Sequence, residues 1–180
     1  MNPYPTIFDL IAAEFRKAGI DHVLVGGFAV NQYGVTRQTA DVDFMILTKD
    51  DAKAVAILEA YGYKEFLRHD IFTRLKSPKA EWIDVDFLFV DAKTLKGIVQ
   101  SGRKTEIFGH EFHVPSLEHL IAMKLHSLKH NTKMREYKDL MDILALVQGN
   151  AVDVSDEKFK KLCRDYGTQE IYEKIVKFSG

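Results

Sequence analysis

Two pairs of aspartates in this sequence have the spacing expected of metal-binding carboxylates. Asp41 and Asp43 are separated by one residue, and Asp84 and Asp86 repeat the pattern. Side chains alternate along a strand, so each pair would point to one face with apolar residues on the other. Like charges this close repel unless a cation neutralises them, and hard oxygen ligands suit Mg²⁺. If the two strands are neighbours, three carboxylates meet, a set suited to phosphoryl or nucleotidyl transfer.

A glycine pair precedes the first acidic pair. Gly26 and Gly27 follow an apolar run at 22–25 and precede a short helical pattern, which predicts a strand-to-helix turn. Glycines let the backbone approach a phosphate closely, and the N–H groups after them point at the anion. Arg37 and Thr39 add a guanidinium and a hydroxyl that could contact phosphate oxygens. The competing interpretations are a tight turn, a solvated loop arginine and a solvated strand face for the aspartates.

Helical and strand periodicities place these residues on a sequence of elements. In the first part of the chain they predict helices near 7–18, 28–33, 49–60 and 91–100. The predicted strands are 22–25, 41–47, 71–75 and 81–90, within a β-rich stretch from 63 to 90, and a hairpin of 105–108 with 111–114. Beyond residue 116 the pattern is only helical, in segments near 117–129, 134–148, 155–166 and 168–178.

This order predicts an α+β fold in which a mixed core is followed by a C-terminal helical segment. The expected boundary is at Pro115-Ser116, which gives an α/β core over 1–115 and helices over 116–180 packed on it. A chain of 180 residues is long enough for one domain with a sizeable core, or for a small domain with a helical appendage.

The composition narrows the class of protein. Hydrophobic residues make up 46% and charged residues 28%, with a net charge of −1, as is usual for a globular protein. This charge balance argues against a nucleic-acid-binding protein whose affinity comes from many basic residues in contact with phosphates, although a local basic patch is compatible with it. The single cysteine, Cys163, excludes an internal disulfide and a cysteine-rich zinc site. We expect a cytoplasmic protein, since the sequence has neither a signal-peptide core nor an apolar stretch that would span a membrane.

Several motifs together resemble the nucleotidyltransferase superfamily that shares the DNA polymerase β palm. They are Val25-Gly26-Gly27, Arg37-x-Thr39-x-Asp41-x-Asp43 and Ile83-Asp84-Val85-Asp86. The closer likeness is to minimal bacterial and archaeal members, including AbiEii-type toxins. Lys124 on a predicted helix, followed by Arg135-x-x-Lys138-Asp139-x-x-Asp142, resembles a helical pattern of that group. In the pattern of the group three residues separate the arginine from the lysine, and in this sequence two do.

The resemblance implies a mixed β-sheet flanked by helices and a role for each matched residue. Asp41 and Asp43 would hold metal and triphosphate, and Asp84 or Asp86 would help to activate the acceptor hydroxyl. We favour Asp84 as this third carboxylate and metal ligand, because Ile83-Asp84 fits the strand entry of the family. The phosphate contacts would come from Gly26, Gly27, Arg37, Thr39, Lys124 and Lys138. Gly27 stands where many members have serine, so a hydroxyl contact to phosphate is missing.

The implied function is transfer of an NMP group from an NTP such as ATP to a hydroxyl, dependent on Mg²⁺ or Mn²⁺. The acceptor could be an RNA end, a protein or a small molecule. The alternative from another class is a non-catalytic module of this fold that binds a cognate partner protein in a toxin–antitoxin-like pair. Retention of all the carboxylates argues against it, because a binding relic has no use for converging charges. A weaker alternative is a phosphohydrolase using the same metals.

Overall fold

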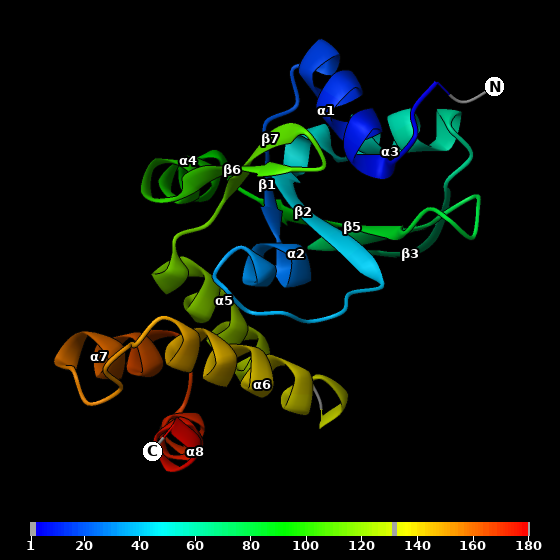
Figure 1. Cartoon of the computed structure of the whole chain (residues 1–180). Coiled ribbons are helices and arrows are strands. Elements are labelled where there is room, and N and C mark those ends of the chain that lie inside the picture. The colour runs from blue at the N-terminus through cyan, green and yellow to red at the C-terminus, as the bar shows by residue number, and fades with distance from the viewer. Residues whose placement is uncertain (1–2, 131–132, 180) are drawn as a thin grey trace. The chain divides into compact units, whose positions relative to one another are not determined.

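The computed structural model describes residues 3–130 and 133–179 and divides into two compact units (Figure 1). Unit 1 comprises Met1–Ala29 and Arg37–Pro115, and unit 2 comprises Val30–Thr36 and Ser116–Gly180. The segment 30–36 therefore groups with the C-terminal helices. Whether the chain has a domain boundary at 115–116, as the sequence predicts, stays a prediction.

Unit 1 is built on a five-stranded mixed sheet. In spatial order its strands are β1 (His22–Val25), β2 (Asp41–Leu47), β5 (Asp84–Val90), β4 (Phe72–Lys76) and β3 (Lys64–His69). Only β2 and β5 pair in parallel, and the other neighbours are antiparallel. The predicted α+β class, with a mixed sheet flanked by helices, is confirmed.

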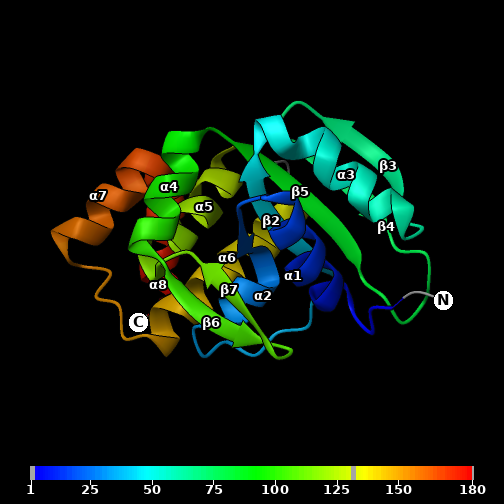
Figure 2. The same cartoon turned by 90° about the horizontal axis from the view of Figure 1, so that it is seen from above.

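Two helices cover one face of this sheet, α1 (Ile7–Ala18) and α3 (Asp51–Ala60), the latter preceded by the 3₁₀ turn η1 (Thr48–Asp50) (Figures 1 and 2). Helix α1 begins at a capping box of Thr6 and Asp9 and ends at Gly19, whose φ of 64° suits a residue without Cβ. Its apolar stripe is buried, and the Phe15 ring lies 5.8 Å from that of Phe87 on β5. The covered face is therefore the apolar face of the central strands.

The remainder of unit 1 is α4 (Ala92–Ser101) and the hairpin of β6 (Arg103–Ile107) and β7 (His110–Val114). Asp91 caps α4 by accepting a hydrogen bond from the Thr94 N–H at 2.8 Å. The helix expected at 28–33 spans 26–31, so the glycine pair opens it, and two other expectations also differ from the structure. Strand β5 begins at residue 84 and not 81, because the chain turns there and the Trp82 N–H bonds to the Lys79 carbonyl. Strand β3 is a separate strand that periodicity does not single out, because its residues are exposed throughout.

The described residues of unit 2 after Ser116 form helices, as the periodicity predicts. They are α5 (Leu117–His130), α6 (Lys133–Gly149), α7 (Glu157–Tyr166) and α8 (Gln169–Ser179). Helix α2 (Gly26–Asn31) starts in unit 1, and its last two residues belong to unit 2. Within unit 2 the Asn150 side chain donates to the Tyr33 carbonyl at 3.0 Å, which ties segment 30–36 to the end of α6. Among the residues described, no helix has the length and apolarity to cross a membrane.

Candidate active site

The four aspartates lie on two adjacent strands and in register. In the parallel pairing of β2 with β5, Asp41 is opposite Asp84 and Asp43 is opposite Asp86. Neighbouring strands are about 4.8 Å apart, and residues paired in this way project to the same face. The intervening residues of the two strands, such as Val42 and Val85, are fully buried on the other face. The sheet thus gathers the predicted carboxylates on the face opposite α1 and α3.

A third strand, β4, places a base beside each carboxylate of β5. Arg74 is the cross-strand neighbour of Asp86, with Nε 2.9 Å from Oδ2. Lys76 Nζ lies 2.8 Å from Asp84 Oδ2, and the backbone N–H of Ser77 donates to Asp84 Oδ1 at 2.9 Å. Partial burial raises the pKa of Asp84, but the bonds from Lys76 and Ser77 outweigh it and hold that pKa below its usual value. Asp84 is therefore ionised at neutral pH.

The sequence interpretation missed Arg74 and Lys76. The available signal was their i, i+2 spacing, which is the same as that of the aspartates and places both bases on one face of a strand.

The two β5 carboxylates differ in their surroundings. The side chain of Asp86 is 9% exposed and that of Asp84 is 21% exposed. Asp86 is paired with Asp43, whose partner on β1 is the residue before the glycine turn. Asp84 lies two residues closer to the start of β5 and is paired with Asp41. Throughout the described parts of the chain, no three Asp, Glu, His or Cys side chains form a group that could hold a metal ion.

The glycine turn lies directly against the first acidic strand. Val25 pairs with Asp43, and the next residue, Gly26, has a φ of 63°. A Cβ on Gly26 would overlap the Asp43 carboxylate. A Cβ on Gly27 would lie 2.8 Å from both Arg37 Nη2 and Thr39 Oγ1, closer than real contacts allow. The two glycines thus leave room for Asp43 of β2 and for Arg37 and Thr39, which precede that strand.

Thr39 contacts the strand that it precedes. Its hydroxyl lies 2.9 Å from the carbonyl oxygen of Asp41 and 3.1 Å from Asp41 Oδ1, both of which are acceptors. A hydroxyl that binds a carboxylate oxygen fixes its orientation. Gly26, Gly27, Arg37 and Thr39 are therefore brought together with the β2 carboxylates, as the sequence predicts, and their role toward phosphate stays a prediction.

The two remaining candidates, Lys124 and Lys138, belong to unit 2. Lys124 Nζ on α5 lies 2.8 Å from Asp139 Oδ1 and 2.8 Å from Asp142 Oδ2, both on α6, and Ser127 Oγ donates to Asp139 Oδ2 at 2.6 Å. Burial lowers the pKa of Lys124, but the two carboxylates more than reverse this and raise it. Lys138 is exposed.

The two aspartates of the α6 motif belong to this cluster. In the structure both aspartates are buried and share Lys124 of the neighbouring helix. The Arg135 side chain lies outside the described residues.

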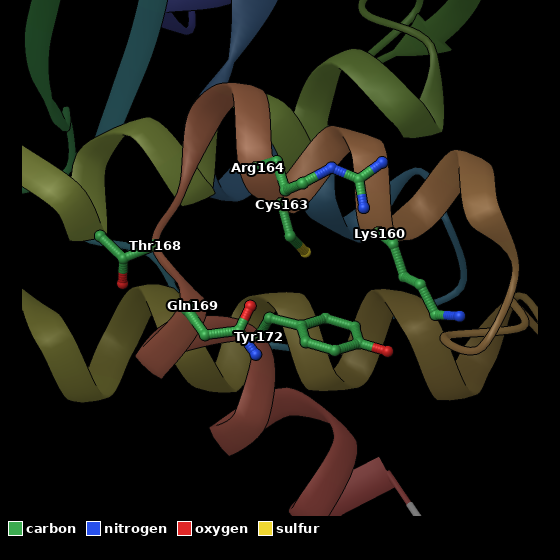
Figure 3. A pocket seen from close by; sticks show the side chains of 6 residues that line it. All are labelled: Lys160, Cys163, Arg164, Thr168, Gln169 and Tyr172. Carbon is green, nitrogen blue, oxygen red and sulfur yellow. The ribbon is translucent and has the colours of Figure 1, made fainter.

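Unit 2 also has a small cleft of about 230 Å³ between α7 and α8 (Figure 3). Its lining side chains are Lys160, Cys163, Arg164, Thr168, Gln169 and Tyr172. Burial raises the pKa of Cys163 to about 11, so its thiol is neutral and a poor nucleophile at physiological pH. With no carboxylate and no thiolate in its lining, the cleft lacks the groups for the chemistry that the β2–β5 face supports.

Comparison with known proteins gives one family and several structures. A family model described as "Uncharacterised nucleotidyltransferase" matches residues 6–179. No curated protein matches the chain. Similar structures include ANT(2″)-Ia in complex with adenylyl-2″-tobramycin, with 15% identity, a TM-score of 0.58, and coverage of 96% of this chain and 94% of that one.

Two further structures share the fold, with similarly low sequence identity. An antigenic nucleotidyltransferase-like protein from Paracoccidioides brasiliensis has 14% identity and a TM-score of 0.54, covering 93% of this chain and 89% of that one. The Megavirus polyadenylate synthase has 17% identity and a TM-score of 0.56, covering 83% of this chain and 32% of that one.

Proposed function

Since the chain belongs to the family described as uncharacterised nucleotidyltransferases, we propose that it transfers an NMP group from an NTP to an acceptor hydroxyl. The observation that carries the proposal is the register of β2 with β5, which places four carboxylates on one sheet face beside the Gly26-Gly27 turn. The likeness to structures under 20% identical supports the fold only, so the chemistry is argued from these residues.

Asp41 and Asp43 are the proposed ligands of Mg²⁺. Mg²⁺ in phosphate-transferring sites is held by one or two carboxylates together with substrate phosphate oxygens, so two aspartates on one strand face fit it. Bound there, the ion would offset the negative charge that develops during transfer. Thr39 orients Asp41 from one side, and the Gly26 turn leaves space for Asp43 on the other.

We propose Asp86 as the third carboxylate, in place of the Asp84 that the strand motif favoured. Asp86 lies opposite Asp43, the proposed metal ligand that is itself paired with the residue before the glycine turn. Each β5 carboxylate is paired with a base of β4, Asp86 with Arg74 and Asp84 with Lys76, and Asp84 also accepts a hydrogen bond from the Ser77 N–H. In this role Asp86 accepts the proton of the acceptor hydroxyl, whose oxygen then bonds to the α-phosphorus as pyrophosphate leaves.

The phosphate contacts are proposed to involve Arg37 and the Gly26-Gly27 backbone. Arg37 Nη2 lies within 2.8 Å of the place where a Cβ on residue 27 would stand. A guanidinium at that place supplies charged donors to phosphate oxygens where a serine would supply one hydroxyl. Gly27 then compensates for the missing hydroxyl by admitting the arginine.

The comparisons leave the acceptor open. The structures that share the fold include an enzyme with an adenylylated antibiotic and a polyadenylate synthase, whose acceptors differ in chemistry. The fold therefore supports nucleotidyl transfer without selecting the hydroxyl that receives the NMP group.

The test is calorimetric binding of each NTP with and without Mg²⁺, followed by pyrophosphate release in the presence of RNA, protein extract or small hydroxyl compounds. We expect Mg²⁺-dependent binding that Asp43→Asn abolishes. Asp86→Asn should retain binding and lower the rate of transfer about a hundred-fold or more, the range for loss of a general base. Asp84→Asn should lower it far less.

Asp50→Asn is the matched control, because Asp50 follows the same strand but lies outside the carboxylate face. Circular dichroism checks that each variant folds. A wild-type chain that binds no NTP in Mg²⁺ and releases no pyrophosphate refutes the enzyme proposal. Release of orthophosphate would instead indicate a phosphohydrolase.

A further inference from the structure

The sheet face that carries the aspartates continues across β4 to the edge strand β3. Cross-strand partners project to the same face. On β4 the residues on this face are Phe72, Arg74 and Lys76, since Arg74 pairs with Asp86 and the buried Thr73 and Leu75 point the other way. Their partners on β3 are His69, Leu67 and Lys64. A row of aromatic, apolar and basic side chains thus adjoins the carboxylates.

Aromatic rings gather at one end of this surface. The rings of His69 and Phe72 are stacked, with centroids 5.5 Å apart and planes 12° from parallel. The Arg74 guanidinium lies over Phe72, with its central carbon 5.4 Å from the ring centroid. His69 is exposed, and β3 is exposed along its whole length. A flat, accessible stack with a cation beside it is the kind of platform on which a nucleobase stacks.

Positive charge gathers at the other end. Lys64 and Lys76 are direct cross-strand partners, and both are exposed. Lys76 is also bonded to Asp84 at 2.8 Å, and Lys64 lies across from it at the exposed edge of the sheet. From residue 64 to residue 79 five side chains are Lys or Arg and two are Asp or Glu, in a chain whose net charge is −1. Of these five bases, Arg68, Arg74 and Lys76 are paired with carboxylates, so Lys64 and Lys79 supply the positive charge that remains on this hairpin.

We propose that the hairpin track, defined as Lys64, His69, Phe72 and Lys76, binds a single-stranded polynucleotide whose 3′ hydroxyl is the acceptor. The proposal rests on the proposed function. Such a strand offers π-faces to the aromatic stack and phosphates to the lysine pair, and the track adjoins Asp86. The 3′ oxygen bonds to the α-phosphorus of the NTP, the bond to the β-phosphate breaks, pyrophosphate leaves, and the hydroxyl proton passes to Asp86.

Other acceptors match this surface less well. An amino-sugar and an acidic peptide both lack a base to place on the His69–Phe72 stack. The observed combination of stacking and positive charge is the one by which proteins bind single strands with little sequence preference.

The experiment measures binding of the full chain to a 5′-labelled 12-nucleotide RNA, and to DNA of the same sequence, by fluorescence anisotropy over a series of salt concentrations. Phe72→Leu keeps an apolar side chain and removes the π-face, and it should weaken binding about ten-fold. Lys64→Gln should weaken binding and reduce the slope of log K against log salt by about 0.7, the value for one phosphate contact on a single strand.

Arg68→Gln is the matched control. Arg68 is on β3 and pairs with Thr73, so it points to the other face, where its guanidinium contacts Glu65 and Asp51. This variant removes the same charge from the same hairpin and should leave affinity within about two-fold and the salt slope unchanged. Circular dichroism and NTP calorimetry confirm that all three variants are folded and bind nucleotide as the wild type does.

Any one of three results would contradict the proposal. The wild type could bind no oligonucleotide, Lys64→Gln and Arg68→Gln could lose equal affinity for RNA, or Phe72→Leu could bind RNA as tightly as the wild type. Displacement of the RNA by polyglutamate with no effect of Phe72→Leu would identify a general anion surface instead. If the chain consumes NTP but the track variants behave as wild type, the track fails and the proposed function stands. If the chain binds RNA by the track but no NTP, the proposed function fails.

Discussion

At the scale of single residues, the geometry of this site requires glycine at two positions, 26 and 27. Gly26 has a backbone conformation that L side chains rarely adopt, and the space of its missing Cβ is filled by the Asp43 carboxylate. The space beside Gly27 is filled by Arg37 and Thr39. A residue larger than glycine therefore cannot be placed at either position without moving a proposed ligand of the triphosphate or its metal.

Gly26→Ala and Gly19→Ala separate backbone strain from damage to the site. Both glycines have φ near 63°, but a Cβ on Gly19 would meet open space. We expect each variant to lose about 1 kcal/mol of unfolding free energy, because alanine is strained in the left-handed region. Only Gly26→Ala should also lose Mg²⁺-dependent NTP binding, measured by calorimetry beside urea unfolding. Equal NTP affinity in the two variants would contradict the contact with Asp43.

At the scale of elements, the sequence predicted those strands and helices whose burial is periodic. Asp41–Leu47 and Ile7–Ala18 are examples, because apolar residues that recur at the period of each element are buried. Strand β3 has no buried face, so no periodicity could reveal it. Alternation likewise makes Asp84 and Asp86 equivalent. What distinguishes them is the register with β2 and β4, which is set by pairing across distant parts of the chain.

The start of β1 makes the stability of unit 1 sensitive to pH. The His22 ring lies 5.4 Å from Phe15, 5.7 Å from Phe44 and 5.8 Å from Phe112. Desolvation lowers the pKa of His22, although a bond to the Ile20 carbonyl opposes this. The unfolded chain then binds more protons than the folded one below about pH 6.5, so the free energy of unfolding should fall as the pH drops from that value.

Urea unfolding of the wild type and of His22→Phe between pH 7.5 and 5 measures this effect. The difference between the two curves isolates His22 from the other histidines, and we expect the variant to lose less stability on acidification. A difference that stays constant over this range would show that His22 has the same pKa in the folded and unfolded chain.

At the scale of the whole molecule, each compact unit has its own intrinsic probe. The single tryptophan, Trp82, is buried in unit 1, and the single cysteine, Cys163, is buried in unit 2. Tryptophan fluorescence reports the unfolding of the first unit, and the reaction of a thiol reagent with Cys163 reports the opening of the second. The effect of a substitution can therefore be assigned to a unit without introducing a further reporter residue.

Lys124→Met should give the clearest difference between the unfolding midpoints that these two probes report. It keeps an unbranched side chain of similar length but leaves Asp139 and Asp142 buried without the ammonium that bridges them. Breaking a buried ion pair from one side costs about 3–5 kcal/mol, so the urea concentration at which Cys163 becomes reactive should fall strongly and the Trp82 midpoint should fall less. Lys138→Met, at an exposed position of α6, should change either midpoint by the equivalent of about 0.5 kcal/mol or less. If Lys124→Met instead keeps the wild-type thiol midpoint and loses NTP binding, the lysine acts on the triphosphate, as its motif implies, and its pairing with the aspartates contributes little to the fold.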